Sequence, residues 1–300
     1  MSRRLLLAAP LIAAALALSA CGSGTQDRQG RNSKGQLAVV ASFYPLQFAT
    51  EQIGGGHVAV TSLTKPGAEP HDIELTPQDV ATVSKARVVV YEKGLQGAVD
   101  QAVESQGGDR GLDVATAANL NLRFASGTTD PHFWLDPQRY SGVAKVISAR
   151  LSSLDPANKA GYAKNAKAFE DKLAALSQEF TTGLASCRRK DIVTSHSAFG
   201  YLAQRFGMTQ IAISGLSPSQ EPKAAALAAV SSYARAHGVT TIYAETLASP
   251  AIAATVAKES GARMATLDPI EGLTKRSNGK DYFEVMRSNL KALQAGQGCS

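Results

Sequence analysis

LAVVASFYPLQFATEQIGGGHVAVTSL, residues 37–63, begins and ends with short runs rich in branched apolar residues, Leu37–Ser42 and Val58–Leu63. A stretch of helical character separates the two runs. Runs that are apolar throughout, instead of alternating with polar residues, are typical of parallel strands that helices cover on both faces. This segment therefore predicts two strands of a parallel sheet with a helix between them.

The same alternation continues along the chain and forms two sets of four apolar runs. The remaining runs are 87–91 and 111–115 in the first half, and 191–195, 209–213, 240–244 and 262–267 in the second. A chain of 300 residues with 44% hydrophobic content is long and apolar enough for two cores. We expect an α/β protein with two lobes, residues 37–154 and 187–300. Each lobe should hold a four-stranded, mainly parallel sheet flanked by helices.

One long connecting helix is predicted between the lobes, over residues 155–186. It starts at Asp155–Pro156, a capping residue followed by proline at the first helical position. One apolar stripe recurs at spacings of four and three residues: Tyr162, Ala166, Phe169, Leu173, Leu176 and Phe180. At 1.5 Å per residue the helix would be about 43 Å long. A helix of this length should contact both lobes and, as a stiff connector, limit how far they swing.

The first 20 residues have the features of a secretory signal peptide. Arg3 and Arg4 precede an apolar run, Leu5–Leu18, that is shorter than the roughly 20 residues needed to span a bilayer. Leu18–Cys21 resembles the bacterial lipobox, in which cleavage leaves the cysteine first and its sulfur carries a lipid. Residues 21–36, rich in Gly, Ser, Gln and Arg, would then form a flexible tether. We expect an extracytoplasmic lipoprotein anchored to the cell membrane; an ordinary signal peptide followed by a chance cysteine is the alternative.

The charge balance gives no indication of nucleic-acid binding. The chain carries a formal net charge of +6, and loss of residues 1–20 would remove two arginines and no acid, leaving about +4. The basic residues are dispersed, without a block of Lys and Arg. We expect a monomer that binds no nucleic acid.

The cysteines suggest one disulfide. The chain has three, and lipidation of Cys21 would leave Cys187 and Cys299 in a compartment outside the reducing cytoplasm. A Cys187–Cys299 bridge is the simplest interpretation, and two buried, unpaired thiols are the alternative.

The five histidines fall into two groups. His57 follows three glycines in a loop and His237 lies at a predicted helix end, and the surroundings of neither suggest a ligand. His71 and His196 each lie beyond a predicted strand, and His132 lies directly ahead of a predicted helix. In open α/β sheets the loops at the carboxyl ends of strands face a crevice that binds ligands.

A carboxylate in the second half could complete a site with these three histidines. Asp268 directly follows the last predicted strand. Three imidazoles and one carboxylate, drawn from both lobes, would suit the four-coordinate shell that zinc prefers. Glu69, two residues before His71, is an alternative ligand. Spacing alone does not establish a metal site here, because ligands some 60 to 70 residues apart form no local motif.

Four segments carry a resemblance to a known family. They are PGAEPHDIELTP (66–77), DPHFWLDP (130–137), SHSAFGYLAQRFG (195–207) and ATLDPIEG (265–272). In this order and at these separations they resemble the metal-site segments of the zinc and manganese substrate-binding proteins of ABC importers. The resemblance covers residues 37–294. It implies two α/β lobes, a rigid interlobe helix and one transition-metal ion held by His71, His132, His196 and Asp268.

The resemblance also implies a function and a metal. The protein would capture Zn²⁺ in the interlobe cleft and deliver it to an ABC transporter permease for import. Manganese-binding members commonly have glutamate at the third position, whereas this chain has His196. Nitrogen donors suit zinc, while Mn²⁺ prefers carboxylates and water, so manganese is the alternative. Many zinc members carry a His-rich loop before the second ligand, but residues 119–130 contain no histidine, so we expect no auxiliary site.

We expect no enzymatic activity. A zinc hydrolase would need an open coordination position and a general base, and the sequence has no HExxH motif. Glu245, after the run 240–244, is the one plausible base, but it could equally orient a ligand histidine or be an exposed loop residue. Phe133 and Trp134 should form a wall of the metal cavity. A surface adhesin is a third possibility that no sequence feature indicates.

Replacing Cys21 with alanine tests the predicted anchor. The parent should fractionate with membranes, and the Cys21→Ala variant should appear as a soluble or unprocessed form because no lipid can be attached. Cell fractionation followed by immunoblotting measures this. Unchanged membrane association of the variant would contradict the lipoprotein assignment.

Overall fold

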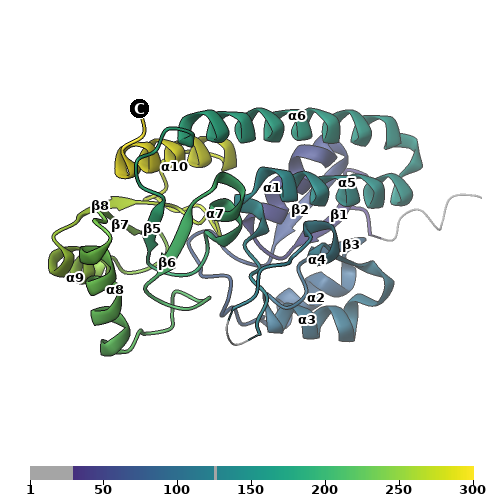
Figure 1. Ribbon diagram of the computed structural model, residues 1–300. Helices are drawn as coiled ribbons and strands as arrows, with labels where there is room; N and C mark the ends of the chain where they lie inside the picture. The colour runs from purple at the N-terminus through teal and green to yellow at the C-terminus, as the bar shows by residue number, and fades with distance from the viewer. Residues whose placement is uncertain (1–29, 125–126) are drawn as a thin grey trace, which may run out of the picture.

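The computed structural model describes residues 30–124 and 127–300, which form two sheets side by side (Figure 1). The first sheet has the order β2-β1-β3-β4, with β1 Leu37–Ala41, β2 Val58–Ser62, β3 Val88–Tyr91 and β4 Gly111–Asp113. The second has the order β6-β5-β7-β8, with β5 Asp191–Thr194, β6 Thr209–Ala212, β7 Thr241–Ala244 and β8 Arg263–Thr266. Every strand pair is parallel. The expected fold class is confirmed, and both sheets have the same strand order.

Helices cover both faces of each sheet (Figure 1). The longer helices are α1 Tyr44–Gly54, α2 Pro77–Lys85, α5 Pro137–Leu154, α6 Lys159–Leu184, α8 Ala224–Ala236, α9 Ala251–Ser260 and α10 Tyr282–Gln297. The shorter ones are α3 Gly97–Ala102, α4 Ala115–Ala118 and α7 Gly200–Phe206. In the first lobe α1, α5 and α6 lie on one side of the sheet, and α2 and α3 lie on the other.

Residues within one strand alternate between two separate cores. In β1, Val39 faces the core shared with α1, α5 and α6, whereas Val40 packs with Val83 of α2 on the opposite face. Both faces of the strand are apolar for this reason, since successive side chains point to opposite sides of a sheet.

The connecting helix contacts both lobes, as the sequence predicts. The helix α6 has 26 residues and is about 39 Å long at 1.5 Å per residue. It packs against α5 and α1 of the first lobe and against α10 and α7 of the second. All six residues of the predicted stripe are buried. The expected start at Asp155–Pro156 differs in detail, because Pro156–Asn158 form a separate 3₁₀ turn before α6 begins.

The described end of the predicted tether is folded against the first lobe. Residues 30–36 make a tight turn in which the Asn32 carboxamide oxygen accepts hydrogen bonds from the Lys34 and Gln36 amides. Arg31 then forms an antiparallel bridge with Leu37. The predicted signal peptide and Cys21 lie outside the described residues. Within residues 30–124 and 127–300 no helix is long and apolar enough to cross a membrane.

The expected disulfide is present between Cys187 and Cys299. It joins the end of α6 to the end of α10, and the two cysteines are 112 positions apart in sequence. Backbone amides of Arg188 and Arg189 also donate to carbonyls of the last turn of α10 and the residue after it. The chain terminus is thereby attached to the start of the second lobe.

Removing this bridge should destabilise the metal-free protein. In the chain-entropy model, closing a loop of this length contributes roughly 4–5 kcal/mol, and less where the denatured state is compact. Urea unfolding of the Cys187→Ser/Cys299→Ser variant should therefore show a lower free energy of unfolding than the oxidised parent. The reduced parent should match the variant, and equal stability of all three would contradict this role.

Candidate metal site

Three histidines and one glutamate meet between the lobes. His71 lies in the loop after β2, His132 lies just before the 3₁₀ turn that precedes α5, and His196 follows β5. Glu271 lies in the loop after β8. One donor atom of each residue lies within 4.8 Å of the others. Glu271, His132 and His196 are fully buried, and only His71 is partly exposed.

The distances within the group suit a tetrahedral metal ion. Glu271 Oε1 lies 3.1 Å from Nε2 of His132 and 3.1 Å from Nε2 of His196. It lies 3.4 Å from Nε2 of His71, which is itself 3.3 Å from Nε2 of His132. Bonds near 2.05 Å to a tetrahedral zinc would place neighbouring donors about 3.3 Å apart. The four residues are therefore arranged for such an ion without large movements.

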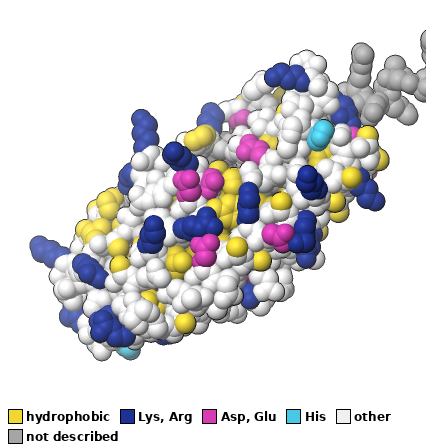
Figure 2. All heavy atoms as spheres, turned by 90° about the horizontal axis from the view of Figure 1, so that it is seen from above, with side chains coloured by type: hydrophobic (Ala, Val, Ile, Leu, Met, Phe, Trp, Pro, Cys, Tyr) yellow, Lys and Arg dark blue, Asp and Glu magenta, His cyan; other side chains and the backbone are white. Residues whose placement is uncertain are grey.

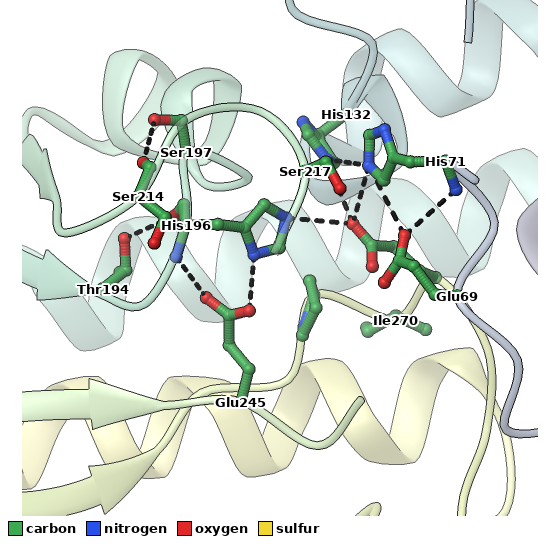
Figure 3. Close-up of polar contacts among 12 residues, drawn as sticks. Glu69, His71, His132, Thr194, His196, Ser197, Ser214, Ser217, Glu245 and Ile270 are labelled. Carbon is green, nitrogen blue, oxygen red and sulfur yellow. Dashed lines mark hydrogen bonds and ion pairs between the residues drawn. The ribbon is translucent and has the colours of Figure 1, made fainter. Parts of the chain in front are cut away.

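Carboxylates fix the orientation of two of the histidine rings. Asp130 Oδ1 accepts from the His132 backbone amide at 3.0 Å and lies 2.8 Å from its ring Nδ1. Glu245 accepts from the His196 amide at 2.9 Å through one oxygen and contacts its ring Nδ1 through the other (Figure 3). In each ring the protonated Nδ1 donates a hydrogen bond to the carboxylate, so Nε2 is free to bind a metal. Glu245 is therefore a buried orienting residue rather than an exposed loop glutamate.

Glu69 holds the third histidine, His71, by accepting a hydrogen bond from the backbone amide of that histidine. Its Oε1 accepts from the His71 amide at 3.0 Å and lies 4.0 Å from His71 Nε2. Burial and the charge of Glu271 raise the pKa of Glu69 to about 8. Glu69 therefore lies beside the four-residue group and not within it. The sequences Glu69-Pro70-His71 and Asp130-Pro131-His132 share this arrangement. In each, the carboxylate of the acid accepts a hydrogen bond from the backbone amide of the histidine two residues later.

The structure places Asp268 outside the group, and Glu271 takes the position expected for it. The Asp268 carboxylate turns back into its own loop, where Oδ1 accepts from the Ile270 amide at 2.8 Å. Asn289 of α10 fixes the same residue through both its backbone amide and its carbonyl. Asp268 lies two residues after the end of β8, but the loop must extend three residues further to reach the histidines. The sequence indicated this alternative only through Glu271, the second acid of the DPIEG segment.

The loop that carries Glu271 is held by contacts from the first lobe. Ile270 has a left-handed backbone, with φ of 57°, which is a strained conformation for a β-branched residue. Just before it, the Pro269 carbonyl accepts a hydrogen bond from the Trp134 indole at 2.7 Å. The Trp134 ring also lies 5.3 Å from the ring of His132. Trp134 therefore forms a wall of the site, as expected, and also connects the two lobes.

A second cross-lobe contact covers the His71 loop. The Asp72 carboxylate accepts hydrogen bonds from the hydroxyls of Ser217, at 3.1 Å, and Ser219, at 2.5 Å. Both serines lie in the loop after β6. Because Asp72 adjoins His71, these bonds hold the exposed side of the site closed.

Burial and the neighbouring charges shift the pKa values of the residues in this group. Burial alone would raise the pKa of Glu271, but His196 and the hydrogen bonds from the imidazoles hold it well below its usual range. Burial alone would lower the pKa of His196, but the charges of Glu245 and Glu271 raise it well above its usual value. Burial lowers the pKa of His71. These shifts favour an anionic Glu271 beside a protonated His196.

The other two histidines lie elsewhere. The ring of His57 contacts Tyr162 at the first lobe, and His237 stacks on Tyr233 at the end of α8. Neither belongs to the group of donors.

Two α/β lobes that share one long helix and enclose three histidines and a carboxylate define a solute-binding protein of the transition-metal type. The chain matches the sequence profile of ZnuA, the periplasmic component A of the zinc-uptake complex, over residues 39–296. The protein belongs to this family, which confirms the resemblance seen in its sequence. The family is a group of solute-binding transport components.

Relatives of known name agree with this assignment. The chain is 35% identical to the high-affinity zinc uptake system protein ZnuA of Bacillus subtilis, with 93% of each chain covered. It is 34% identical to the zinc-binding lipoprotein AdcA of Streptococcus pneumoniae, covering 93% of this chain but only 58% of AdcA. The Zn(II)-bound ZnuA-like domain of AdcA superposes with a TM-score of 0.76 at 36% identity, covering 88% and 99% of the two chains.

Glu245→Gln should lower the pKa of His196 in the metal-free protein, because a neutral amide then replaces the negatively charged carboxylate beside ring Nδ1. Protonated His196 stabilises the fold below its unfolded pKa of about 6.5. This contribution is lost as pH rises through the raised folded pKa. The free energy of unfolding of the parent should therefore fall as pH rises from the unfolded to the folded pKa of His196. In the variant the same fall in the free energy of unfolding should occur at lower pH. Histidine NMR titration measures the pKa, with exposed Glu104→Gln as the control; an unshifted His196 would contradict the assignment.

Proposed function

We propose that this chain binds one Zn²⁺ between its lobes and delivers it to the permease of an ABC-type importer. The observation that carries the proposal is the buried group of His71, His132, His196 and Glu271, with its spacings close to those of a tetrahedral shell. Membership of a zinc-uptake family and similarity to a Zn(II)-bound structure support the same metal.

The donor set favours zinc over manganese. Three imidazole nitrogens and one carboxylate oxygen are ligands typical of four-coordinate zinc. Manganese prefers more oxygen donors and a larger coordination number, and it lies at the weak end of the affinity series. A buried site with three nitrogens among four donors provides little of what manganese requires.

Transport fits the site better than hydrolysis. Four protein donors would complete a tetrahedral shell, so no position remains for the water that a zinc hydrolase activates. Glu245, the one candidate base, is engaged with the Nδ1 side of His196 and not with the side that faces the metal. Delivery would require the cross-lobe bonds of Asp72 to Ser217 and Ser219 to break, since they close the exposed side of the site.

The proposed location is the extracytoplasmic side of the cell membrane, with a lipid on Cys21. The family is described as periplasmic, and one relative is a zinc-binding lipoprotein. The partner would be a membrane permease, and the protein would act as a monomer. One similar structure, Lmb of Streptococcus agalactiae, is described as a bifunctional protein with adhesin and metal-transporting activity. Adhesion is not part of the function proposed for this chain.

Zinc titration of ligand variants tests the proposal. His132→Ala, His196→Ala and Glu271→Ala should each weaken binding by at least about 100-fold, since each removes a donor from a closed shell. Zinc affinity of the parent should fall as pH drops, because protons compete for the imidazoles. Competition with a chromophoric chelator measures both effects.

His57→Ala and His237→Ala serve as controls and should bind zinc like the parent. Asp268→Ala distinguishes the two carboxylates, because it should lower stability while leaving zinc affinity closer to the parent than Glu271→Ala does. Parent-like affinity in the His132 and His196 variants, or metal-dependent hydrolysis by the parent, would overturn the proposal.

A further inference from the structure

A basic hollow lies at the end of the first lobe remote from the metal site. Four of the residues that line it are cationic, Arg31, Lys85, Arg87 and Arg110, and none is acidic. They surround Ala38 at the amino end of β1, whereas the metal site lies beyond the carboxyl ends of the strands. This hollow has no part in the function proposed above.

The cations of the hollow are held in place by different means. The Arg110 guanidinium donates to the backbone carbonyls of Ser84, Gln106 and Gly107, and Arg31 pairs with Asp155 at 3.1 Å. The contacts of Arg110 are with neutral carbonyls and leave its positive charge uncompensated.

The remaining two cations of the hollow are Lys85 and Arg87. Lys85 is exposed in the last turn of α2, and the Arg87 stem lies against Gly30. Among the described residues neither side chain has an ion-pair partner. Elsewhere the charges are more mixed: on the face seen from above in Figure 2, Lys and Arg side chains are scattered with Asp and Glu among them.

The hollow lies beside Gly30, the first residue that the structure describes. The Gly30 carbonyl accepts from the Ala38 amide at 2.8 Å, and the Ala38 carbonyl accepts from the Arg87 amide at 2.7 Å. Cys21 precedes Gly30 by nine positions, and a chain of that length reaches at most about 32 Å. A lipid on Cys21 would therefore keep this hollow close to the membrane surface.

We propose that the basic hollow binds the headgroups of anionic phospholipids in the membrane to which the chain is anchored. The inference rests on the lipid anchor of the proposed function. Guanidinium and ammonium groups are the usual partners of phosphate oxygens, and arginine can present paired N–H donors to them. The short tether raises the effective concentration of headgroups, so weak contacts suffice. The first lobe would then rest its amino edge on the bilayer whenever the protein is not docked on the permease.

Vesicle binding by protein without the anchor tests the hollow itself. The chain starting at residue 21 and carrying Cys21→Ala should co-sediment with vesicles of phosphatidylcholine and phosphatidylglycerol at about 25 mM salt, and less at about 200 mM. Lys85→Gln/Arg87→Gln keeps both aliphatic stems and removes two charges. It should lower the partition coefficient roughly 25-fold, at about five-fold per charge.

A matched pair of exposed lysines on the second lobe, Lys258→Gln/Lys291→Gln, should change the partition coefficient by less than about three-fold. An equal loss in both double variants, or equal binding to vesicles of phosphatidylcholine alone, would overturn the inference. Zinc titration of the same proteins separates the two proposals: parent-like zinc affinity without vesicle binding rejects the hollow alone, and vesicle binding without zinc binding rejects the metal site alone.

Discussion

One apolar core runs through both lobes, and the geometry of the metal site depends on it. The buried stripe of α6 packs with α1 and α5 on one side and with α10 on the other, so the two sheets share a layer of helices. Close-packed interiors resist deformation, because shifting one element opens voids or creates overlaps along the whole layer. The carboxyl edges of the two sheets thereby face each other, and residues from both edges meet at the site. The disulfide between the ends of α6 and α10 adds a covalent constraint to the same layer.

The side chains of the site, positioned by this core, are already arranged for a small dication. Carboxylates behind His132 and His196 fix the ring orientations, and Glu271 lies among the three imidazoles. A buried carboxylate without a partner would be costly, and here protonated imidazole supplies the counter-charge. Entry of zinc replaces protons by a metal ion at nearly the same positions. Binding should therefore require little rearrangement of the ligands and should depend on pH.

The site is also where the chain departs from relaxed local structure. Ile270 has a backbone conformation that β-branched residues avoid, and it lies directly before Glu271. The Ile270 amide is bonded to Asp268, and the neighbouring Pro269 carbonyl is bonded to Trp134. These contacts compensate for the strain and direct the Glu271 side chain into the cleft. Asp268, the residue expected to bind metal, instead shapes the turn that positions Glu271, the donor proposed in its place.

Periodic features were predictable from the sequence because they depend on neighbours along the chain. The apolar runs indicated eight strands to within one or two residues at each end, and the stripe from Tyr162 to Phe180 indicated the buried face of α6. His71 and His196 could be singled out because loops after parallel strands share one edge of a sheet, and His132 because it directly precedes a predicted helix. The resemblance in four segments supplied the rest of that assignment.

Only the tertiary structure decided which carboxylate joins the histidines. Asp268 and Glu271 are both acids of one short loop, and nothing local distinguishes them. The choice follows from the left-handed turn at Ile270 and from bonds to Trp134 and Asn289, residues distant in sequence. Tertiary contacts also decided the structure of residues 30–36, whose polar composition suggested a tether. They fold because Asn32 closes a turn and Arg31 pairs with Asp155, a contact that spans 124 positions.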